Sequence, residues 1–288
     1  MKALVLGGNG QLGLVLADTV PADVSIVSLS RTDIDITNAD AVLECCRETR
    51  PNVIINAAAY TAVDQAESEQ ELARLVNADG PRNIAVASRD VGARMIHIST
   101  DFVFDGNAST PYQTSAATNP LNTYGRTKRD GELAVLQEAR DSSVVIRTSW
   151  LYSEYGNNFV KTMLRLMEER DKLGVVVDQF GTPTWTNPLA EVVWAFAASP
   201  EHSGIYHWSD HGETSWYEFA VAIQEEALQL GLLDTAIPIR AITTKEYPAA
   251  ALRPRYTVLE CTATQAALHV RQADWRDNLR HMLTGMAR

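Results

Sequence analysis

Short apolar runs alternate with helical patterns along the first half of the chain. The runs that predict strands cover residues 2–6, 24–29, 53–57, 95–98 and 144–146. Helices are predicted over 12–20, over 41–50, over 69–89 with Pro81 at a bend or boundary, and from Tyr124 to Gln137. Because strands that alternate with helices favour a doubly wound parallel sheet, we predict a Rossmann-like α/β fold with ligands at the carboxyl edge of the sheet.

The rhythm of the pattern changes after Trp150. A helix is predicted over 158–169, a β-branched run covers 175–177, and a capping box of Ser215 and Glu218 starts another helix, whose apolar stripe we expect to be core. We expect residues 1–150 to form a dinucleotide-binding domain to which a later segment returns. Residues 151–288 are expected to form mainly a smaller α/β substrate domain, packed closely against the first because no Ser/Gly linker separates them.

Composition and charge narrow the choice of partners. Apolar residues make up 45% of the chain, and 36 acidic against 25 basic residues give a net charge of -11. This balance disfavours sequence-independent attraction to nucleic acid or to an anionic membrane. No apolar run reaches the roughly 20 residues of a membrane span, and we find no signal-peptide pattern, so we expect a cytoplasmic protein.

Three glycines follow the first predicted strand directly. Gly7, Gly10 and Gly13 form a G-x-x-G-x-x-G pattern, which supplies a tight turn, a close approach of the backbone to a pyrophosphate, and close helix packing. At this place in a βα repeat, the pattern favours dinucleotide binding over a merely structural turn. The other residues that we assign to the cofactor site are Gln11, Leu12, Ser30, Arg31, Asp35, Ile36, Ala57, Ala58, Ala59, Tyr124 and Lys128.

The end of the second predicted strand bears on the choice of cofactor. That strand ends in Leu29, Ser30 and Arg31, and no acidic residue stands at its tip to grip a ribose 2′-hydroxyl. We therefore expect NADPH to be preferred. Asp33 and Asp35 lie slightly further on, and they could instead serve NADH or start the next helix.

Candidate proton-transfer groups lie near the fourth predicted strand and at the head of a helix. Tyr124 and Lys128 are four residues apart, so they share a helix face on which the cation could stabilise a phenolate. Ser99 and Thr100 follow the fourth strand and emerge at the same sheet edge as the glycine turn. Taken alone, Tyr124 and Lys128 could be a surface pair, and the hydroxyls of Ser99 and Thr100 could merely cap a turn. Together with the glycine pattern, these residues favour catalysis.

These residues stand in longer stretches that resemble the extended short-chain dehydrogenases/reductases, and within them the dTDP-4-dehydrorhamnose reductase family. The shared stretches cover residues 7–13, 56–64, 97–106, 124–128, 147–150, 158–161, 178–184 and 253–254. They extend over nearly the whole chain. Together they are far more specific than the glycine pattern alone.

The resemblance implies an NADPH-dependent reduction of the C4 ketone of dTDP-4-dehydrorhamnose to dTDP-L-rhamnose. It implies Tyr124 as the general acid, Lys128 as its tuner and a ribose ligand, and Thr100 as the hydroxyl that holds the sugar carbonyl. The residues that it implies near the sugar or the nucleotide are Thr61, Val63, Asp101, Phe102, Trp150, Asn158 and Arg253.

Two positions depart from the family pattern. Phe102 replaces the usual tyrosine, which leaves open which dTDP-keto-sugar is reduced. Val15 replaces a glutamate that some members use for a metal ion at a dimer contact, so we expect no bound Mg²⁺ and leave a homodimer as a possibility.

Other functions on the same fold stay open at this point. A close rival is nucleotide-sugar 4,6-dehydration or epimerisation. Dehydration needs an aspartate and a glutamate in succession, and here Asp101 is followed by Phe102. The remaining alternatives are reduction of another dTDP-deoxysugar ketone, or a non-catalytic NADP-binding subunit similar to the regulatory subunit of methionine adenosyltransferase.

Overall fold

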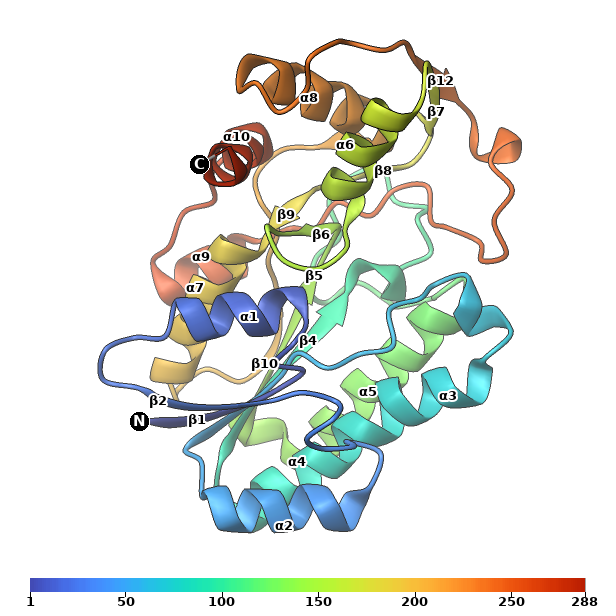
Figure 1. Ribbon diagram of the computed structural model, residues 1–288. Helices are drawn as coiled ribbons and strands as arrows, with labels where there is room; N and C mark the ends of the chain where they lie inside the picture. The colour runs from blue at the N-terminus through green and yellow to red at the C-terminus, as the bar shows by residue number, and fades with distance from the viewer. Residues whose placement is uncertain (288) are drawn as a thin grey trace.

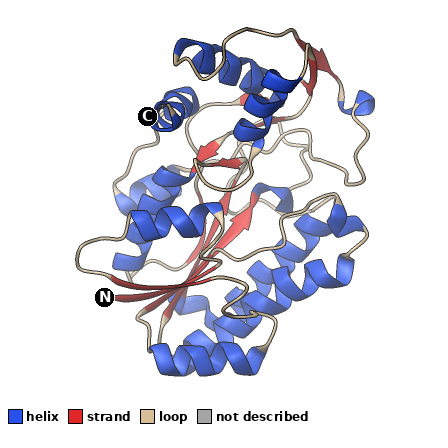
Figure 2. Cartoon of the chain, in the orientation of Figure 1, coloured by secondary structure: helices blue, strands red, loops and turns tan. Residues whose placement is uncertain are grey.

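A six-stranded parallel sheet organises the molecule in the computed structural model, which describes residues 1–287 (Figures 1 and 2). Its strand order is β10-β5-β4-β3-β1-β2. The strands are β1 (Lys2–Leu6), β2 (Ser25–Leu29), β3 (Val53–Asn56), β4 (Arg94–Thr100), β5 (Ser143–Thr148) and β10 (Gly204–His207). The order reverses between β1 and β3, and at such a reversal the loops that follow the two strands diverge and open a crevice. This arrangement confirms the predicted doubly wound α/β fold.

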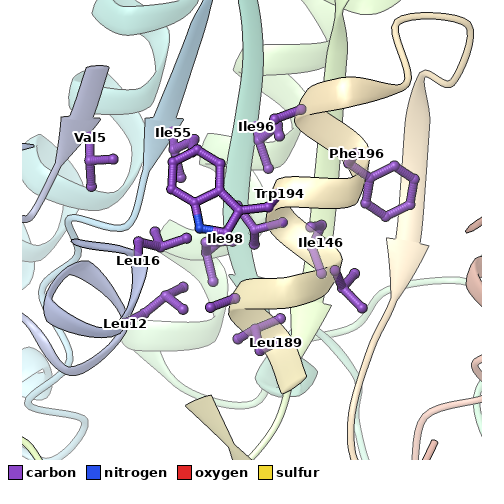
Figure 3. Packing of buried hydrophobic residues seen from close by; sticks show 14 of the residues in the cluster. Val5, Leu12, Leu16, Ile55, Ile96, Ile98, Ile146, Leu189, Trp194 and Phe196 are labelled. Atoms are coloured by element: carbon purple, nitrogen blue, oxygen red, sulfur yellow. The ribbon is translucent and has the colours of Figure 1, made fainter. Parts of the chain in front are cut away.

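Helices cover both faces of this sheet. One face carries α1 (Gln11–Asp18) and α7 (Thr186–Ala198), and the other carries α2 (Ala39–Thr49), α4 (Gly80–Val91) and α5 (Thr123–Ala139). Figure 3 shows Trp194 and Phe196 of α7 against Ile96, Ile98 and Ile146 of the strands. Strands buried on both faces need continuous apolar runs, and this explains why they stand out in the sequence.

The helix that was predicted over 69–89 is divided in the structure. It consists of α3 (Gln70–Arg74), a π-helical turn η2 (Leu75–Asp79) and α4, with Pro81 in the first turn of α4. The Asn77 side chain accepts a hydrogen bond from Tyr60 N at 2.8 Å and donates to Thr127 Oγ1 at 3.2 Å. The turn thus places a buried amide between the loop after β3 and helix α5.

A second lobe lies beyond the carboxyl edge of the sheet (Figure 1). Its core is formed by apolar side chains of three helices and of the strand β7, among them Met163, Val175, Phe219, Ile223 and Leu279. The helices are α6 (Phe159–Glu169), α8 (Trp216–Gln229) and α10 (Trp275–Met286), and α9 (Thr262–Leu268) contacts β10 and α7. The short strands pair as β7 (Leu173–Val176) with β12 (Ile239–Ile242), β6 (Leu151–Tyr152) with β9 (Thr184–Trp185), and β8 (Phe180–Gly181) with β11 (Thr214–Ser215).

The chain returns to the sheet after the second lobe has begun, because β10 pairs with β5 and α7 packs on α1. The boundary at residue 150 remains a prediction. Within residues 1–287, the structure contains no helix that is both long enough and apolar enough to cross a bilayer.

Candidate active site

The glycine turn lies against the loop that follows β3. Gly7 has a φ of +92°, and a Cβ atom there would stand 2.6 Å from Ala58 N. A Cβ atom on Gly13 would collide with the carbonyl oxygen of Gly7. Both positions therefore need glycine, the first for its backbone angle and the second so that α1 can begin directly over the turn.

A cleft of about 300 Å³ opens at this point, where the strand order reverses. The predicted cofactor residues that line it are Gly7, Gly10, Ser30, Arg31, Asp35, Ile36, Ala57, Ala58 and Ala59. It is also lined by Asn9, Tyr60 and Leu72, which the sequence did not single out. A crevice with a glycine turn at a helix start fits the diphosphate of a dinucleotide, whose charge the helix N-terminus favours.

Five of the predicted cofactor residues are not among those that line this cleft, namely Gln11, Leu12, Gly13, Tyr124 and Lys128. Leu12 is only 5% exposed and packs in the core beneath α1. The Gln11 side chain accepts a hydrogen bond from Asn158 Nδ2 at 3.0 Å, which ties the start of α1 to the start of α6.

The acidic residues after β2 are engaged in local turns. Asp33 accepts hydrogen bonds from the backbone and hydroxyl of Ser30 at 2.8 and 2.6 Å, and these lower its pKa. Asp35 accepts from the backbone and hydroxyl of Thr37 at 2.9 and 2.8 Å, and those bonds lower its pKa too. Neither aspartate starts helix α2, because Asn38 caps that helix by accepting a hydrogen bond from Ala41 N. Asp35 and Arg31 thus remain the charged groups that line the cleft after β2.

Thr100 and the Tyr124–Lys128 pair meet at the end of β4, one strand away from the cleft. Asn122 caps α5 by accepting a hydrogen bond from Gly125 N at 2.8 Å, so Tyr124 lies in the first turn of that helix. Lys128 is 2% exposed, and its Nζ donates to the carbonyl oxygen of Ile98 on β4 at 2.7 Å. The helix start and the strand end thus hold the hydroxyls and the ammonium at one edge of the sheet.

Burial dominates the pKa values of this pair. It raises the pKa of Tyr124 to about 12, against the opposing effect of a hydrogen bond with Thr100. It lowers the pKa of Lys128 to about 8, and the charge of Glu132 opposes that shift. The expectation that Lys128 lowers the pKa of the phenol is not met in the protein alone, where the net shift is upward because desolvation of the phenolate is its largest cause. A phenol with this pKa is fully protonated at neutral pH, as a proton donor must be.

Asp101 and Phe102 flank the same centre. Asp101 is 1% exposed, accepts a hydrogen bond from Thr100 Oγ1 at 3.0 Å, and has a pKa that burial raises to about 6. The Phe102 ring meets the Tyr124 ring edge to face at a centroid distance of 5.7 Å. Phe102 therefore fixes the position of the Tyr124 ring without offering a hydroxyl of its own.

The two neighbouring hydroxyls of β4 have different surroundings, which leads to a prediction. Thr100 interacts with Tyr124 and Asp101, whereas Ser99 Oγ donates to the buried carboxylate of Glu132. We expect Thr100→Val to lower kcat/KM severely and Ser99→Ala to lower it only mildly, because a valine cannot hold a carbonyl oxygen. Steady-state kinetics of both variants give the ranking, and the reverse order would place the catalytic hydroxyl at position 99.

A second cavity of about 500 Å³ lies in the second lobe, between α6, β7 and α8. Of the predicted substrate residues, only Arg253 lines it. The lining side chains that the sequence did not assign to a site are those of Phe159, Thr162, Met163, Leu166, Arg170, Lys172, Leu173, Val175, Val176, Gln179, Trp216 and Tyr247. An apolar wall with three cations suits a flat ring joined to an anionic group.

The remaining predicted substrate residues lie around this cavity or away from it. Trp150 has a φ of +46° and stacks on Trp216, a lining residue, with ring centroids 3.5 Å apart. Thr61 is exposed and Val63 half-buried on the loop after β3. Asn158 caps α6 and donates to Ser153 O and Gln11 Oε1, so its amide is already satisfied within the protein.

Comparison with known proteins places this geometry in a family. The model of the family described as "RmlD substrate binding domain" matches residues 1–288. The chain is 41% identical to the dTDP-4-dehydrorhamnose reductase of Aggregatibacter actinomycetemcomitans, over 98% of both chains. The chain belongs to the dTDP-4-dehydrorhamnose reductase family. Family membership confirms the resemblance drawn from the sequence stretches.

Solved structures of the family superpose over the full chain. The dTDP-4-dehydrorhamnose reductase of Clostridium acetobutylicum has a TM-score of 0.93 at 39% identity and 100% coverage of both chains. The enzyme of Bacillus anthracis, crystallised in complex with NADP, has a TM-score of 0.92 at 37% identity and 99% coverage of both chains.

Proposed function

We propose that this protein reduces the C4 ketone of dTDP-4-dehydrorhamnose to dTDP-L-rhamnose with NADPH. The observation that carries this proposal is the meeting of Thr100, Tyr124 and Lys128 at the carboxyl edge of the sheet, one strand from a cleft that suits a dinucleotide. It is supported by 41% identity to a curated dTDP-4-dehydrorhamnose reductase. The NADP complex of the Bacillus anthracis relative supports the choice of cofactor.

The residues of the chain have distinct parts in this reaction. A bound nicotinamide supplies the hydride. Thr100 holds the ketone oxygen by a hydrogen bond, and Tyr124 donates its phenolic proton to that oxygen as negative charge develops there. Lys128, fixed on Ile98 O and one helical turn after Tyr124, offers a positive charge that favours the phenolate left after transfer.

We further propose that the two lobes bind different ligands. Residues 1–150, with β10 and α7, hold the dinucleotide, and most of 151–288 holds the sugar nucleotide. This division agrees with the positions of the two cavities, one at the β1–β3 edge and one between α6, β7 and α8. In the larger cavity Arg170, Lys172 and Arg253 offer positive charge to a diphosphate.

One experiment tests the function directly. The purified chain is incubated with NADPH and dTDP-4-dehydrorhamnose, NADPH oxidation is followed by absorbance, and the sugar nucleotide is identified by chromatography. We expect stoichiometric formation of dTDP-L-rhamnose. If NADPH is oxidised only with another dTDP-4-keto-sugar, that sugar is the substrate. If NADPH binds but no turnover occurs, the protein is better explained as a regulatory subunit, and a pull-down would then identify its partner.

The charges after β2 lead to a prediction on the cofactor. Asp35 lines the cleft, but Arg31 also lines it, and the charge of Arg31 contributes to the lowered pKa of Asp35. A guanidinium at that place favours a 2′-phosphate. We therefore expect a higher kcat/KM with NADPH than with NADH. In Arg31→Ala, the ratio of the two kcat/KM values should be smaller. A higher kcat/KM with NADH in the parent protein would refute the assignment.

A further prediction concerns metal ions and assembly. Val15 is 2% exposed in the core, and within residues 1–287 no group of three or more His, Cys, Asp or Glu side chains is placed to hold a metal ion. We expect activity to survive exhaustive EDTA treatment and Mg²⁺ to change neither turnover nor the sedimentation coefficient. Loss of activity that Mg²⁺ restores, or a shift to smaller species on chelation, would reveal a metal-bridged contact. The same sedimentation run tests whether the protein forms a homodimer.

A further inference from the structure

An ion pair joins the loop after β3 to a segment 189 residues further along the chain. Arg253 Nη2 lies 2.7 Å from Asp64 Oδ2, and Nη1 lies 3.2 Å from Asp64 Oδ1. Asp64 Oδ1 also accepts a hydrogen bond from Ala251 N at 3.0 Å. The hydrogen bond from Arg253 is the main cause of the lowered pKa of Asp64. The carboxylate is therefore ionised at neutral pH, and it accepts hydrogen bonds from both the backbone of Ala251 and the side chain of Arg253.

The same segment is held from a second side. Asn122 Nδ2 donates to the carbonyl oxygen of Leu252 at 2.7 Å, while Asn122 Oδ1 caps the helix that carries Tyr124. Asp64 and Asn122 thus fix residues 251–253 between the loop after β3 and the start of α5. Leu252 itself is 71% exposed, so burial of its side chain does not hold this segment in place.

Arg253 lines the cavity in the second lobe, and its side chain is 22% exposed. A guanidinium has five N–H donors in a rigid fork. Each of the two terminal nitrogens donates to Asp64, and Nη1 also donates to Ala251 O at 3.5 Å. The Nε–H and one N–H of Nη2 are left for a ligand. An arginine already held in one rotamer loses less conformational entropy when it binds an anion than a mobile one does.

We propose that Asp64 is a positioning residue, which aims Arg253 at the diphosphate of the sugar nucleotide. The proposal rests on the proposed function, because it takes a nucleoside diphosphate sugar as the ligand of the larger cavity. It assigns no proton transfer to Asp64, which acts only through the orientation of Arg253 and of the segment 251–253.

The direction in which Asp64→Asn changes the affinity for an anion distinguishes this positioning role from a simple charge effect. Asp64→Asn removes a negative charge near the cavity. If Asp64 only weakened the positive field of Arg253, its removal would tighten the binding of an anion. If it positions the guanidinium, the loss of the bidentate contact weakens binding.

The probe is dTDP alone, whose binding to the NADP-loaded protein is measured by titration calorimetry. We expect Asp64→Asn to raise the Kd for dTDP and the KM for the keto-sugar about 10-fold, with kcat within about twofold and the Kd for NADPH unchanged. In an Arg253→Gln background, Asp64→Asn should have no further effect, because the residue that it positions is gone. A thermal melt of each variant verifies that the protein is folded.

Asp79→Asn is the matched control. Asp79 pairs with Arg74 at 2.7 Å at the end of the π-helical turn η2, and both side chains are partly exposed. We expect its loss to leave dTDP binding unchanged. Unchanged or tighter dTDP binding in Asp64→Asn, an equal effect in the Arg253→Gln background, or a loss of kcat without a change in KM would overturn the inference. A parent protein that binds no dTDP would overturn the nucleotide assignment as well, so the two failures are distinguishable.

Discussion

Replacement of Tyr124 by phenylalanine is expected to lower kcat by at least about 100-fold, the effect that is typical of the loss of a general acid. The phenol has its pKa raised to about 12 by burial, so it carries its proton throughout the neutral range. Phenylalanine keeps the ring that meets Phe102 edge to face at 5.7 Å but has no proton to give. Stopped-flow measurement of NADPH oxidation in a single turnover isolates the chemical step, and NADPH affinity should change little.

A second tyrosine serves as a control for the removal of a hydroxyl. The hydroxyl of Tyr256 donates to Glu213 at 3.0 Å, in a partly exposed part of the second lobe. Tyr256→Phe removes the same atom from a hydrogen bond to a carboxylate, and we expect turnover to stay near that of the parent. Near-normal turnover in Tyr124→Phe would instead move the role of acid to Asp101. Its pKa is raised by burial to about 6, so Asp101 could also hold a proton near neutral pH.

Much of the sheet could be predicted because its strands are buried on both faces. Residues 53–56 and 143–148 have no exposed position, and within them 53–55 and 144–146 form the short apolar runs that are visible in the sequence. Helix starts were visible where a side chain caps them, as at Asn158 and Ser215. The glycine turn was visible for a different reason, since a Cβ atom at Gly7 or Gly13 would collide with backbone.

Features that depend on distant contacts could not be predicted in this way. Strand β10 has only four residues, three of them half-buried, and its partner β5 precedes it by more than 50 residues. The π-helical turn η2 is marked by the contacts of Asn77 with Tyr60 and Thr127, which no local pattern reveals.

The larger cavity shows the same limit. Trp216 lies on the apolar stripe of α8, and such a stripe predicts residues of a hydrophobic core. Trp216 nevertheless lines the cavity. Arg170 and Lys172 follow the end of α6, where basic residues are common on any surface. Only the fold, by bringing α6, β7 and residue 253 together, distinguishes them from other exposed cations.

A buried ion pair between α5 and β5 has the largest expected effect on stability. Arg147 donates to both carboxylate oxygens of Glu132, at 2.9 and 2.8 Å, and the two side chains are only 3% and 2% exposed. Ser99 Oγ donates to the same carboxylate. The charge of Glu132 also raises the pKa of Lys128, which lies four residues earlier on the same helix. One carboxylate thus balances two buried cations.

We expect Glu132→Gln to lower the free energy of unfolding by about 3–5 kcal/mol, because it leaves the guanidinium of Arg147 buried without a counter-charge. Urea denaturation followed by circular dichroism measures the loss. The pKa of Lys128 should fall further below 8, since burial lowers it and Glu132 opposes that shift. The ammonium is protonated below its pKa, so the decline of kcat/KM with rising pH should begin at a lower pH in the variant.

Glu138→Gln is the control, because Glu138 lies on the same helix and pairs with the exposed Arg82 and Arg89 at 3.4 and 3.0 Å. The Glu138 side chain is 13% exposed, but its partners Arg82 and Arg89 are 62% and 60% exposed. Water can solvate both guanidiniums when the pair is lost, so this variant should lose far less stability than Glu132→Gln. The double variant Glu132→Gln/Arg147→Met should recover much of the stability, since it removes the uncompensated charge while a long apolar side chain stays in place. It should still show the lowered pH limit, because Lys128 lacks its counter-charge in both variants. Equal stability losses in Glu132→Gln and Glu138→Gln would mean that water reaches the Arg147 guanidinium and that the pair is not a buried one.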